Sequence, residues 1–569
     1  GHKNMGTQPK TESPPKRPGM VDWYAPIELT QTGLRALAST ALGAMIDTRT
    51  ILSIKANAED CVFDYTRDKN GKDRDTFTFD YTADTGDGFN STYSMAYLFT
   101  SNELDVQGVE SKLKRSELVI LGGDEVYPVA NKSAYFHRLI SPFKQAAKDL
   151  RKALSTAGSR ARLARKDLFM IPGNHDWYDG LGSMSRRFFS HATPGKENVF
   201  GQQRKPRELG QFHTHQPQGY FVNVLPHDWE IWAVDIQLGN DIDPEQFAFF
   251  SWRSESLSQE SKVIICSAIP TIVYGKDREK GSLTFGLDRI SKLVRDKGAR
   301  TCAQFAGDVH NYQRYEVPKT SKCDVNYTRQ HVVCGGWGAF LHPNHSFHKA
   351  DAESDRKEPV MRFPSRDQSK ALSRRILLFP FKHLGMCALI GLLYLLMFWQ
   401  EGPPGFSIAE LSAYAVNHPT TLILLAVALL GCMGFAKKKR AWGLLHGAVH
   451  VAAAVLSWKA GDAVVQWLAS FPWLQGFEPI TWRLATFLVG GALGGSIFGF
   501  YLYASLNWFR IHRNEAFSSL SWPHYKSFLR CEVEKDGSLT VNVIGVDKTA
   551  SETESHPVKT HLVERFSMK

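Results

Sequence analysis

Four long apolar runs between Ile376 and Phe509 constrain the fold of this chain more than any other feature. Each run is close to the roughly 20 residues that an α-helix needs to cross the hydrocarbon core of a membrane. Charged residues separate the runs, which favours membrane spans over buried helices of a large soluble core. We therefore predict a four-helix transmembrane insert over residues 371–513, with spans at Ile376–Trp399, Thr420–Ala436, Ala441–Trp458 and Leu484–Phe509.

Positive charge is distributed unevenly around these runs. Arg374 and Arg375 precede the first run, Lys437–Arg440 joins the second to the third, and Arg510 and Arg513 follow the fourth. The two other loops carry almost no positive charge. Cytoplasmic loops are the ones enriched in Lys and Arg. The pattern predicts a multi-pass protein of the plasma (inner) membrane, with both termini and the remaining soluble part in the cytoplasm.

Two side-chain patterns lie within the apolar runs. Gly491, Gly495 and Gly499 recur every four residues, which favours close helix packing, either inside the bundle or between copies in a homo-oligomer. His446 and His450 are one turn apart and share a helix face. Polar groups in lipid usually face the bundle interior. The pair therefore has two readings, interhelical hydrogen bonding or a role with a metal, a proton or a substrate.

The rest of the chain has the composition of soluble protein. We predict a disordered tail over residues 1–19, a soluble α/β domain over 20–370 and a C-terminal hairpin over 514–569. The net charge is +11, and part of it lies beside the apolar runs, which favours a membrane surface over nucleic acid. No extended Lys/Arg stripe with interleaved aromatic residues is present. The eight cysteines include no CxxC pair, which argues against a zinc ribbon.

Short apolar segments in the soluble part are each followed by polar or glycine-containing sequence. This pattern is typical of buried strands whose carboxyl ends carry loops, and such loops usually carry the chemistry. Two more strands, at Ser527–Glu534 and Ser538–Val546, flank a Lys535-Asp536-Gly537 turn and predict a hairpin that completes the sheet. The predicted buried strands are Glu117–Gly122, Asp167–Ile171, Trp229–Asp235, Lys262–Ala268 and Thr301–Ala306.

Four polar motifs follow in order along the chain, most of them directly after an apolar strand. Asp, Asn and His side chains are ligands suited to paired Fe, Mn or Zn ions. Each motif also carries a glycine that lets the backbone turn tightly near the ligand. One such motif alone is weak, but four in order predict a metal centre. They are Asp84-Thr85-Gly86-Asp87, Gly123-Asp124-Glu125-Val126-Tyr127, Gly173-Asn174-His175-Asp176 and Gly307-Asp308-Val309-His310.

These motifs resemble the calcineurin-like metallophosphoesterase superfamily over Phe79–His345, most specifically through Gly173–Asp176. The resemblance implies a four-layer αββα sandwich with a two-metal site at the strand ends. Asp84-x-Gly86 together with Asp124-x-x-Tyr127 is similar to the purple acid phosphatase branch, in which the tyrosine binds Fe(III). The cofactors implied are two metal ions, Fe with Fe, Mn or Zn.

The resemblance also implies a role for each matching residue. One metal would be held by Asp84, Asp124, Tyr127 and His310, Asp124 would bridge the two metals, and Asn174 would hold the second. His175, oriented by Asp176, would contact the phosphate and protonate the leaving group.

Two positions depart from the family pattern. Asp308 stands where the family has a histidine, and its carboxylate can also ligate a metal. No histidine follows the Val263–Cys266 strand, so the second metal lacks an expected ligand. Further candidate ligands or substrate contacts are Asp87, His342 and His345, with weaker candidates at His213 and His215.

The function expected from these residues is hydrolysis of a phosphoester, for which a lipid-linked phosphate is a natural candidate, at the cytoplasmic face of the membrane. Two alternatives stay open. One is a phosphodiesterase or nuclease of the same superfamily. The other is a degenerate phosphoesterase that serves as a membrane sensor or scaffold, because of the missing histidine.

Overall fold

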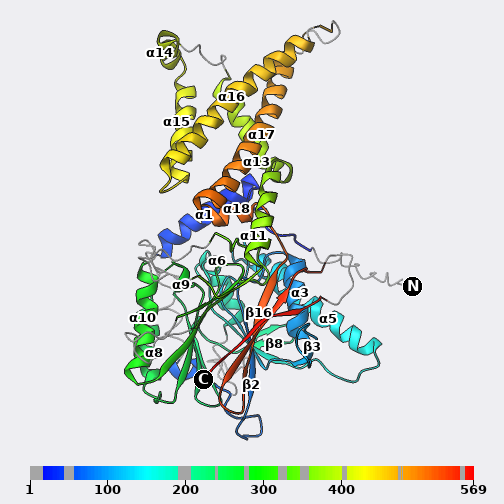
Figure 1. Ribbon diagram of the computed structural model, residues 1–569, viewed down its shortest axis with the longest axis vertical. Helices are drawn as coiled ribbons and strands as arrows, with labels where there is room; N and C mark the ends of the chain where they lie inside the picture. The colour runs from blue at the N-terminus through cyan, green and yellow to red at the C-terminus, as the bar shows by residue number, and fades with distance from the viewer. Residues whose placement is uncertain are drawn as a thin grey trace, which may run out of the picture. The chain divides into compact units, whose positions relative to one another are not determined.

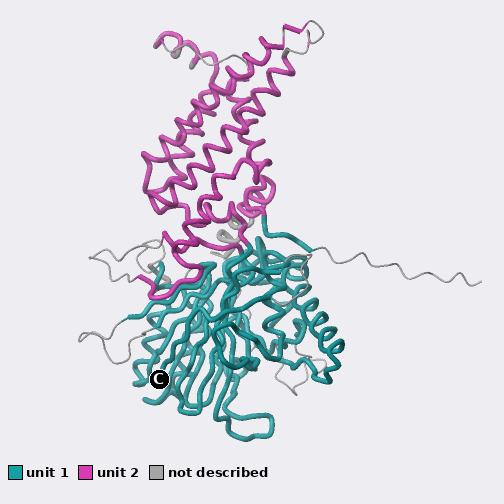
Figure 2. Tube along the Cα trace, turned by 45° about the vertical axis from the view of Figure 1, so that its right-hand side comes forward, with its two compact units in different colours: residues 1–21, 39–339, 523–569 teal, residues 22–38, 340–522 magenta. Residues whose placement is uncertain are grey.

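The computed structural model describes residues 17–43, 57–189, 207–236, 241–274, 281–317, 330–346, 358–399, 407–468, 470–471, 476, 478–550 and 558–569. The chain forms two compact units (Figure 2). Unit 1 contains residues 1–21, 39–339 and 523–569, and unit 2 contains residues 22–38 and 340–522. Most of the tail predicted over residues 1–19 lies outside the described residues.

Unit 1 is a mixed α/β body built on two large sheets (Figure 1). In both sheets the central strands pair in parallel. Seven neighbouring strands of the eight-stranded first sheet are, in spatial order, β1 (Val62–Asp64), β9 (Phe221–Leu225), β10 (Trp229–Val234), β11 (Lys262–Ser267), β12 (Arg300–Ala306), β14 (Gln330–Cys334) and β13 (Tyr312–Glu316). The second contains β18 (His561–Met568), β17 (Leu539–Val546), β16 (Lys526–Val533), β2 (Phe77–Thr82), β5 (Leu118–Leu121), β6 (Lys166–Met170), β8 (Phe212–Thr214) and β7 (Arg207–Leu209).

The central strands are apolar along their length because they are covered on both faces. All four residues of β5 and all six of β10 are buried. Between the sheets, the rings of Tyr81 and Phe305 lie 5.3 Å apart, and those of Phe63 and Phe169 lie 4.6 Å apart. Tyr81 and Phe305 are fully buried, and burial of each such side chain stabilises the fold by about 1.5–3 kcal/mol. Continuous burial explains why these strands read as apolar runs rather than as alternating patterns.

Helices cover the outer face of each sheet (Figure 1). Helices α3 (Phe89–Thr100) and α5 (Ser141–Thr156) share a buried cluster with the second sheet, in which Phe99 packs on Phe528. Helices α8 (Pro244–Ser254) and α10 (Gly281–Asp296) share a cluster with the first sheet. Unit 1 is therefore layered as helices, sheet, sheet and helices. Shorter elements are β3 (Glu103–Leu104), β4 (Leu113–Lys114), α4 (Lys132–Ala134), α6 (Asn174–Trp177), α7 (Gly182–Phe188) and α9 (Thr271–Tyr274).

The C-terminal strands extend the second sheet. Strands β16 and β17 form a hairpin in which Val533 pairs with Leu539, and Gly537 supplies a positive φ of 77° in the turn. Strand β16 pairs antiparallel with β2, and β18, which the sequence pattern did not indicate, adds to β17. Segments more than 400 residues apart in sequence therefore lie side by side in one sheet.

A buried ion pair ties β16 to β2. Two nitrogens of the Arg530 guanidinium donate to the two carboxylate oxygens of Asp80 at 2.8 Å each, and Ser116 donates to the same carboxylate at 2.6 Å. Arg530 and Asp80 are both buried and face each other in the strand register. A bidentate pair has one good geometry, so it specifies this alignment of the two strands.

Unit 2 is predominantly helical and holds the apolar runs. Its elements are α1 (Pro26–Gly43, shared with unit 1 at its C-terminal end), β15 (Met361–Phe363), α11 (Arg366–Ser373), α12 (Phe379–Lys382), α13 (Leu384–Met397), α14 (Ile408–Asn417), α15 (Pro419–Phe435), α16 (Arg440–Leu468), α17 (Glu478–Ala504) and α18 (Arg513–Ser518).

The prediction of four membrane spans is corrected by these helices. Among the described residues, two helices are long and apolar enough to cross a membrane, Arg440–Leu468 and Pro479–Phe509. A third is counted only if Arg366–Lys382 and Leu384–Met397, bent by 61° at their junction, act as one span. Pro380 and Lys382 interrupt that run, and the run before Lys437–Arg440 forms a helix of only 17 residues. The prediction from the length of the apolar runs therefore gave too many continuous long helices.

The glycines of α17 are used for packing within unit 2. A Cβ added at Gly491 would lie 2.8 Å from the Cys387 carbonyl oxygen, and one at Gly495 would lie 2.3 Å from the Cys387 sulfur. Gly499 is similarly close to Phe379. The glycine face therefore receives the α12–α13 segment of the same chain, and oligomerisation through it stays a prediction.

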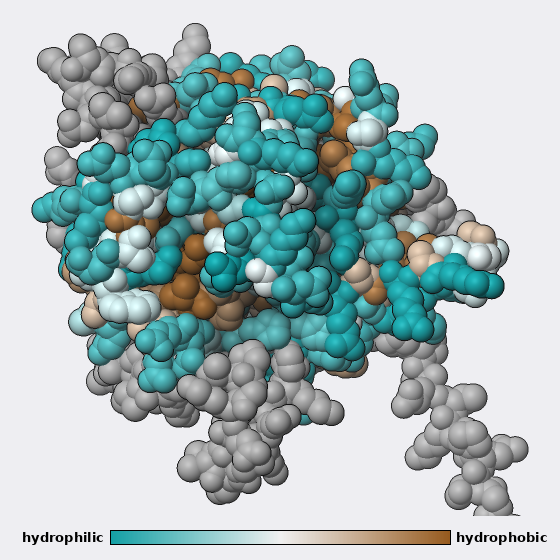
Figure 3. Space-filling view, turned by 90° about the horizontal axis from the view of Figure 1, so that it is seen from below, coloured by the Kyte–Doolittle hydropathy of each residue, from teal (hydrophilic) through white to brown (hydrophobic). Residues whose placement is uncertain are grey.

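The two units differ in their surfaces. Large apolar side chains of the helices are exposed, including Ile423, Val427, Leu430 and Leu488 at 57–63%. The face drawn in Figure 3, by contrast, is mainly hydrophilic with small hydrophobic areas. Exposed apolar helix surface of this extent is typical of contact with lipid rather than water.

Candidate active site

The predicted ligands follow strands that end at one edge of the sheets of unit 1. Asp84 follows β2, Asp124 follows β5 and Asn174 begins the helix after β6, and these three strands are parallel neighbours. Asp308 follows β12 of the facing sheet. The loops are tied directly, because the backbone N–H of Asp84 donates to the Gly123 carbonyl at 2.9 Å. The fold thus gathers four motifs that are far apart in sequence.

Three of these aspartates have an uncommon backbone conformation. The φ angles of Asp84, Asp124 and Asp308 are 61°, 54° and 64°, in the left-handed region that residues other than glycine rarely adopt. Each such residue costs on the order of 1–3 kcal/mol and persists where the surrounding structure enforces it, often at functional sites. Shared strain at three predicted ligands is an observation independent of the motif pattern.

The side chains of three predicted ligands converge on the hydroxyl of a fourth, Tyr127. The hydroxyl donates to Asp84 Oδ1 at 2.8 Å, lies 3.4 Å from Asp124 Oδ2 and lies 3.2 Å from His310 Nε2. His310 Nε2 is also 3.5 Å from Asp84 Oδ1. All four residues are buried. Two carboxylates, a phenol and an imidazole therefore share one small polar centre.

Burial and mutual repulsion oppose ionisation of these carboxyl groups. Burial, followed by the charges of Asp124 and Asp308, raises the pKa of Asp84 well above its usual range. The same causes, burial and then Asp308, raise the pKa of Asp124 to about 7. Asp84 Oδ2 is buried and has no hydrogen-bond partner among the described residues. The centre is therefore arranged so that an added positive charge would stabilise it.

Lys526 is a buried cation near this centre that the motif search did not find. Its ammonium group donates to the Ala339 carbonyl, and burial lowers its pKa to about 7, against the attraction of Asp87 and Asp84. The residue begins β16, more than 200 residues after the last motif. No motif in the neighbouring sequence identifies Lys526 as part of the site. The only local feature is a lysine at the first position of a strand whose other residues are almost all buried.

Asp176 and Glu125 form a second buried carboxyl pair behind the loops. The Asp176 carboxylate accepts from the Tyr135 hydroxyl at 2.6 Å, from Gly173 N at 2.9 Å and from Glu125 N at 3.1 Å. Burial and the charge of Asp124 raise the pKa of Asp176 to about 7. Asp176 therefore joins the loop after β5 to the loop after β6.

The partner that orients the His175 ring is a backbone carbonyl. His175 Nδ1 lies 2.7 Å from the Pro128 oxygen, which requires the proton on Nδ1, and the His175 backbone N–H donates to Asp124 Oδ1 at 2.9 Å. The hydrogen bonds of the Asp176 carboxylate described above go to loop backbone and to Tyr135. Orientation of His175 by Asp176 stays a prediction. Burial lowers the pKa of His175.

Asn174 and Asp87 occupy distinct surroundings. The Asn174 amide nitrogen donates to the Tyr178 hydroxyl at 3.0 Å. Asp87 Oδ1 accepts from the Val21 backbone N–H at 2.7 Å and lies 3.5 Å from an Arg138 nitrogen. In these contacts Asp87 anchors Val21, the last residue of the N-terminal segment of unit 1. Its role as an additional ligand stays a prediction.

The loop that lacks the expected histidine lies against the Gly123 turn. A Cβ added at Gly123 would be 2.6 Å from the Ala268 methyl group, so a small residue occupies this part of the loop. The remaining candidate histidines lie elsewhere. His342 and His345 belong to unit 2, where His345 Nδ1 pairs with Ser369 Oγ at 2.8 Å. His213 and His215 lie near Glu208 and Asp167.

One glycine is required by the geometry of the centre. A Cβ on Gly173 would lie 2.0 Å from Asp124 Oδ1 and 2.2 Å from the Asp124 backbone nitrogen. Real Cβ atoms do not approach that closely, so this position accepts only glycine unless the Asp124 loop moves.

The donor set of this centre suits a metal ion in its ligand types but not in its present arrangement. Among the described residues, no three His, Cys, Asp or Glu side chains form a group with the arrangement of a metal site. The phenol of Tyr127 instead lies at the point of convergence and hydrogen-bonds the carboxylate of Asp84. The ligand types nevertheless suit a hard cation such as Fe or Mn, and the unpartnered Asp84 oxygen together with the raised carboxyl pKa values fits a missing positive charge.

Comparisons with known proteins add little to this description. No family model matches the chain, and no curated protein matches it. Among solved structures, the chain is similar to one titled "Structure of PhoD", with a TM-score of 0.26 and 11% sequence identity. The match covers 47% of this chain and 58% of that chain, less than two thirds of its length. A likeness at this level carries no argument about activity.

Proposed function

We propose that the chain is a membrane-anchored, metal-dependent phosphoesterase whose active site is the Tyr127 centre of unit 1. The observation that carries the proposal is the convergence of Asp84, Asp124, Tyr127 and His310 at adjoining strand ends. Their burial and the left-handed backbone at the two aspartates support a functional rather than a structural cluster.

The residues suited to hold two metal ions divide into two sets that share Asp124. Asp84, Tyr127 and His310 belong with the first ion and Asn174 with the second, and Asp308 and Asp124 add negative charge to both. Bound ions of this kind supply Lewis-acid activation of the phosphoryl group and of water. The small residue at Ala268 leaves the second ion with fewer protein ligands, which favours weaker binding there.

The protein's own acid–base residue in this proposal is His175. Its Nδ1 proton is held by the Pro128 carbonyl, so Nε2 is the atom that would pass a proton to the leaving oxygen. General acid catalysis of this type contributes on the order of 10²–10⁴-fold to rate. Asp176 and Tyr135 hold the two loops in register and would affect rate through position rather than through proton transfer.

The substrate class we propose is a phosphoester presented at the cytoplasmic membrane face, including lipid-linked phosphates. Support comes from the long apolar helices of unit 2 and from the basic residues beside them. Diester cleavage is the alternative within the same chemistry.

Asp124→Asn tests the proposal directly. Purified wild-type protein should hydrolyse aryl phosphate monoesters or diesters after incubation with Mn²⁺ or Fe²⁺, and Asp124→Asn should lose at least about 100-fold, because electrostatic stabilisation of this kind is worth that much or more. Asp64→Asn, at an exposed position of β1, is the matched control and should keep wild-type activity. Equal rates for wild type and Asp124→Asn would exclude this centre as the active site.

A second candidate function is a sensor or scaffold that has lost catalysis. The absence of a histidine after β11 and of a three-ligand His/Cys/Asp/Glu group among the described residues favours it. Wild-type protein that binds metal or a phosphate anion, yet hydrolyses neither ester class, would establish this alternative.

A further inference from the structure

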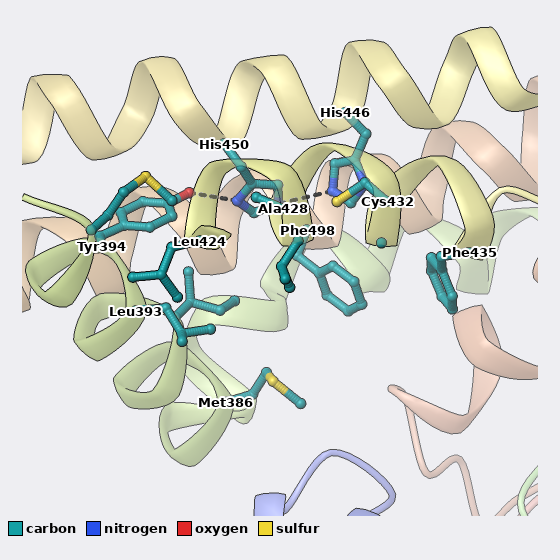
Figure 4. Close-up of a pocket in the computed structure, with 14 residues that line it drawn as sticks. Met386, Leu393, Tyr394, Leu424, Ala428, Cys432, Phe435, His446, His450 and Phe498 are labelled. Carbon is teal, nitrogen blue, oxygen red and sulfur yellow. Dashed lines mark hydrogen bonds between the residues drawn. The ribbon is translucent and has the colours of Figure 1, made fainter. Parts of the chain in front are cut away.

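Buried titratable side chains occur in both units outside the predicted ligands. In unit 2, the Tyr394 hydroxyl of α13 hydrogen-bonds His450 Nδ1 of α16, and His450 Nε2 lies 2.9 Å from His446 Nε2 (Figure 4). This interhelical hydrogen bond matches one of the two readings of the histidine pair. In unit 1, Lys166 and Lys526 are the buried lysines of the described residues. Removing an ammonium group from water is costly, so each needs a compensating contact.

The two lysines have the same local chemistry at opposite edges of the second sheet. Lys526 opens β16 and donates to the Ala339 carbonyl, and Lys166 opens β6 and donates to the Phe99 carbonyl. Burial lowers the pKa of each ammonium group to about 7. Strands β2, β5 and β6 are parallel, whereas β16 is antiparallel to β2. Lys526 therefore lies at the edge where the ligand loops begin, and Lys166 lies at the other edge.

The strand register places Lys526 level with Asp84. Leu529 of β16 pairs with Tyr81 of β2. Continuing this antiparallel register by the same number of residues on both strands leads to Lys526 and Asp84. The Lys526 side chain is fully buried, so it cannot touch a substrate. Any effect that it has on the centre must pass through the groups that it contacts.

The carbonyl that Lys526 contacts belongs to a loop bound to the backbone of Asp84. This loop, residues 335–339, follows β14. The backbone N–H groups of Gly338 and Ala339 both donate to the Asp84 carbonyl, at 2.9 Å each. One peptide group of the first metal-site motif is therefore held by two neighbouring donors of the 335–339 loop.

Strand β16 holds the 335–339 loop at two points. Lys526 donates to the Ala339 carbonyl, and the backbone N–H of Ser527 donates to the Gly336 carbonyl at 2.8 Å. The first of these contacts is made by a side chain and can be removed by substitution. The second is made by the backbone and stays in every variant of Lys526.

Asp84 needs this support because its backbone conformation is unfavourable. Its φ angle of 61° lies in the left-handed region, which persists only where the surroundings enforce it. Its side chain presents Oδ1 to the Tyr127 hydroxyl at 2.8 Å. A shift of the Asp84 backbone would therefore move its carboxylate relative to the other residues of the centre.

We propose that Lys526 is a positioning residue for Asp84, because its bond to Ala339 holds the 335–339 loop against the Asp84 carbonyl. This role rests on the proposed function in one respect, that Asp84 is a metal ligand. Groups that orient metal ligands typically change metal affinity by about 10–100-fold when they are removed.

A purely electrostatic role for Lys526 predicts an effect of opposite sign. A positive charge near the centre repels a bound cation, so its removal would strengthen metal binding. Positioning predicts weaker binding instead. Lys526→Met removes both the charge and the donor, whereas Lys526→Gln removes the charge and keeps an N–H donor for the Ala339 carbonyl. Lys166→Met is the matched control, since it removes the same contact at the other edge of the sheet.

The first measurement uses the metal-free full chain in detergent and follows amide hydrogen exchange by mass spectrometry. Lys526→Met leaves the buried Ala339 carbonyl without its donor, which corresponds to about a 10-fold or larger change in a local equilibrium. We expect faster exchange by about that factor at Gly338 and Ala339 in Lys526→Met. Exchange there should stay at the wild-type rate in Lys166→Met.

The second measurement is Mn²⁺ affinity by calorimetric titration of the same proteins. We expect Lys526→Met to bind at least about 10-fold more weakly than wild type. Lys526→Gln should bind more tightly than Lys526→Met, and Lys166→Met should match wild type. Thermal midpoints of Lys526→Met and Lys166→Met report whether the two substitutions cost similar stability, so a general loss of folding is recognised.

Three outcomes would overturn the proposal. They are wild-type exchange at Gly338 and Ala339 in Lys526→Met, tighter Mn²⁺ binding in both Lys526 variants, and equal changes at these amides in Lys166→Met. Wild-type protein that binds no metal would instead contradict the proposed function. The exchange measurement needs no metal, so it still decides whether Lys526 positions Asp84.

Discussion

The Tyr127 hydroxyl is the residue-scale feature on which the candidate site is built. Burial, followed by the charges of Asp124 and Asp84, raises the pKa of Tyr127 well above 10, so the phenol is protonated in the structure as it stands. Its proton can be released only if positive charge replaces it. A phenolate at this position would therefore report directly on a bound cation.

Tyr127→Phe tests this role. Iron-loaded wild-type protein is expected to show a visible absorption band from a phenolate–iron bond, and Tyr127→Phe is expected to lack it while keeping the ring in place. The hydroxyl of Tyr65 contacts Asp167 and not the centre, so Tyr65→Phe should keep the band. A colourless wild-type protein that binds iron and is active would reject the tyrosinate assignment.

His331 on β14 predicts a pH dependence of stability in unit 1. Burial lowers its pKa to about 4, from 6.5, and Nδ1 pairs with Gln304 at 3.1 Å. The native state binds no proton between these two pH values whereas the unfolded state does, so the free energy of unfolding falls as the pH drops from about 6.5 to 4. The full loss is about 3 kcal/mol.

The measurement is thermal unfolding of wild type and His331→Gln between pH 4.5 and 7.5 in the same detergent. The difference between the two curves isolates this residue from other titrating groups. We expect His331→Gln to lose less stability toward low pH, and parallel curves would contradict the assignment.

At the scale of elements, the apolar strands were predictable. A strand that is buried on both faces has an uninterrupted run of apolar residues in its sequence. Predicted strands at Glu117–Gly122, Asp167–Ile171 and Lys262–Ala268 correspond to β5, β6 and β11. Strand β18 was not predicted, because its residues are mostly half-exposed and half of them are polar. The number of long membrane helices was overestimated, because hydropathy does not show where a helix bends or ends.

The same limit applies to the candidate site. Motif residues such as Asp84 and Asp124 were predictable because each lies beside its own glycine turn. Lys526 and the contact between His175 and Pro128 were not, because they depend on segments brought together by sheet order.

The buried Arg530–Asp80 pair joins strands β16 and β2, and a single substitution in it should lower the free energy of unfolding. Arg530→Met leaves the Asp80 carboxylate buried without its partner, and such a loss costs about 3–5 kcal/mol. Thermal unfolding should show a clearly lower midpoint, and Asp80→Asn added to Arg530→Met should recover part of it.

Arg67→Met is the contrasting variant. Arg67 and Asp73 form an ion pair in which both side chains are largely exposed, so its removal should leave the midpoint unchanged. Equal effects of Arg67→Met and Arg530→Met would show that β16 and β2 are not held by the buried pair.

At the scale of the whole molecule, the second sheet limits the membrane topology. Strands β2 and β16 are adjacent, yet the apolar helices lie between them in sequence. Both flanks of the helical segment therefore belong to one sheet, and we predict an even number of crossings. Two of the described helices are long and apolar enough to cross a membrane. We predict α16 and α17 as the crossing pair and the bent α11–α13 segment as re-entrant.

Fusion reporters test this topology. Green fluorescent protein fused after Lys569 should fluoresce, and a chain truncated after Leu468 with the same fusion should not, because a single crossing would carry the reporter across the inner membrane. A chain truncated after Phe398 should fluoresce if the α11–α13 segment returns to its starting side. Loss of fluorescence in that last fusion would show that the segment crosses, and it would contradict the two-crossing topology.

The central claim, a metal-dependent phosphoesterase at the Tyr127 centre, is tested most directly by metal content and hydrolysis measured on one preparation. Protein stripped with a chelator should be inactive, and it should regain aryl phosphate hydrolysis in proportion to bound Fe or Mn as the content rises toward two ions per chain. Asp124→Asn should bind fewer ions and stay inactive. Wild-type hydrolysis that persists without metal, or metal binding unaffected by Asp124→Asn, would contradict the account.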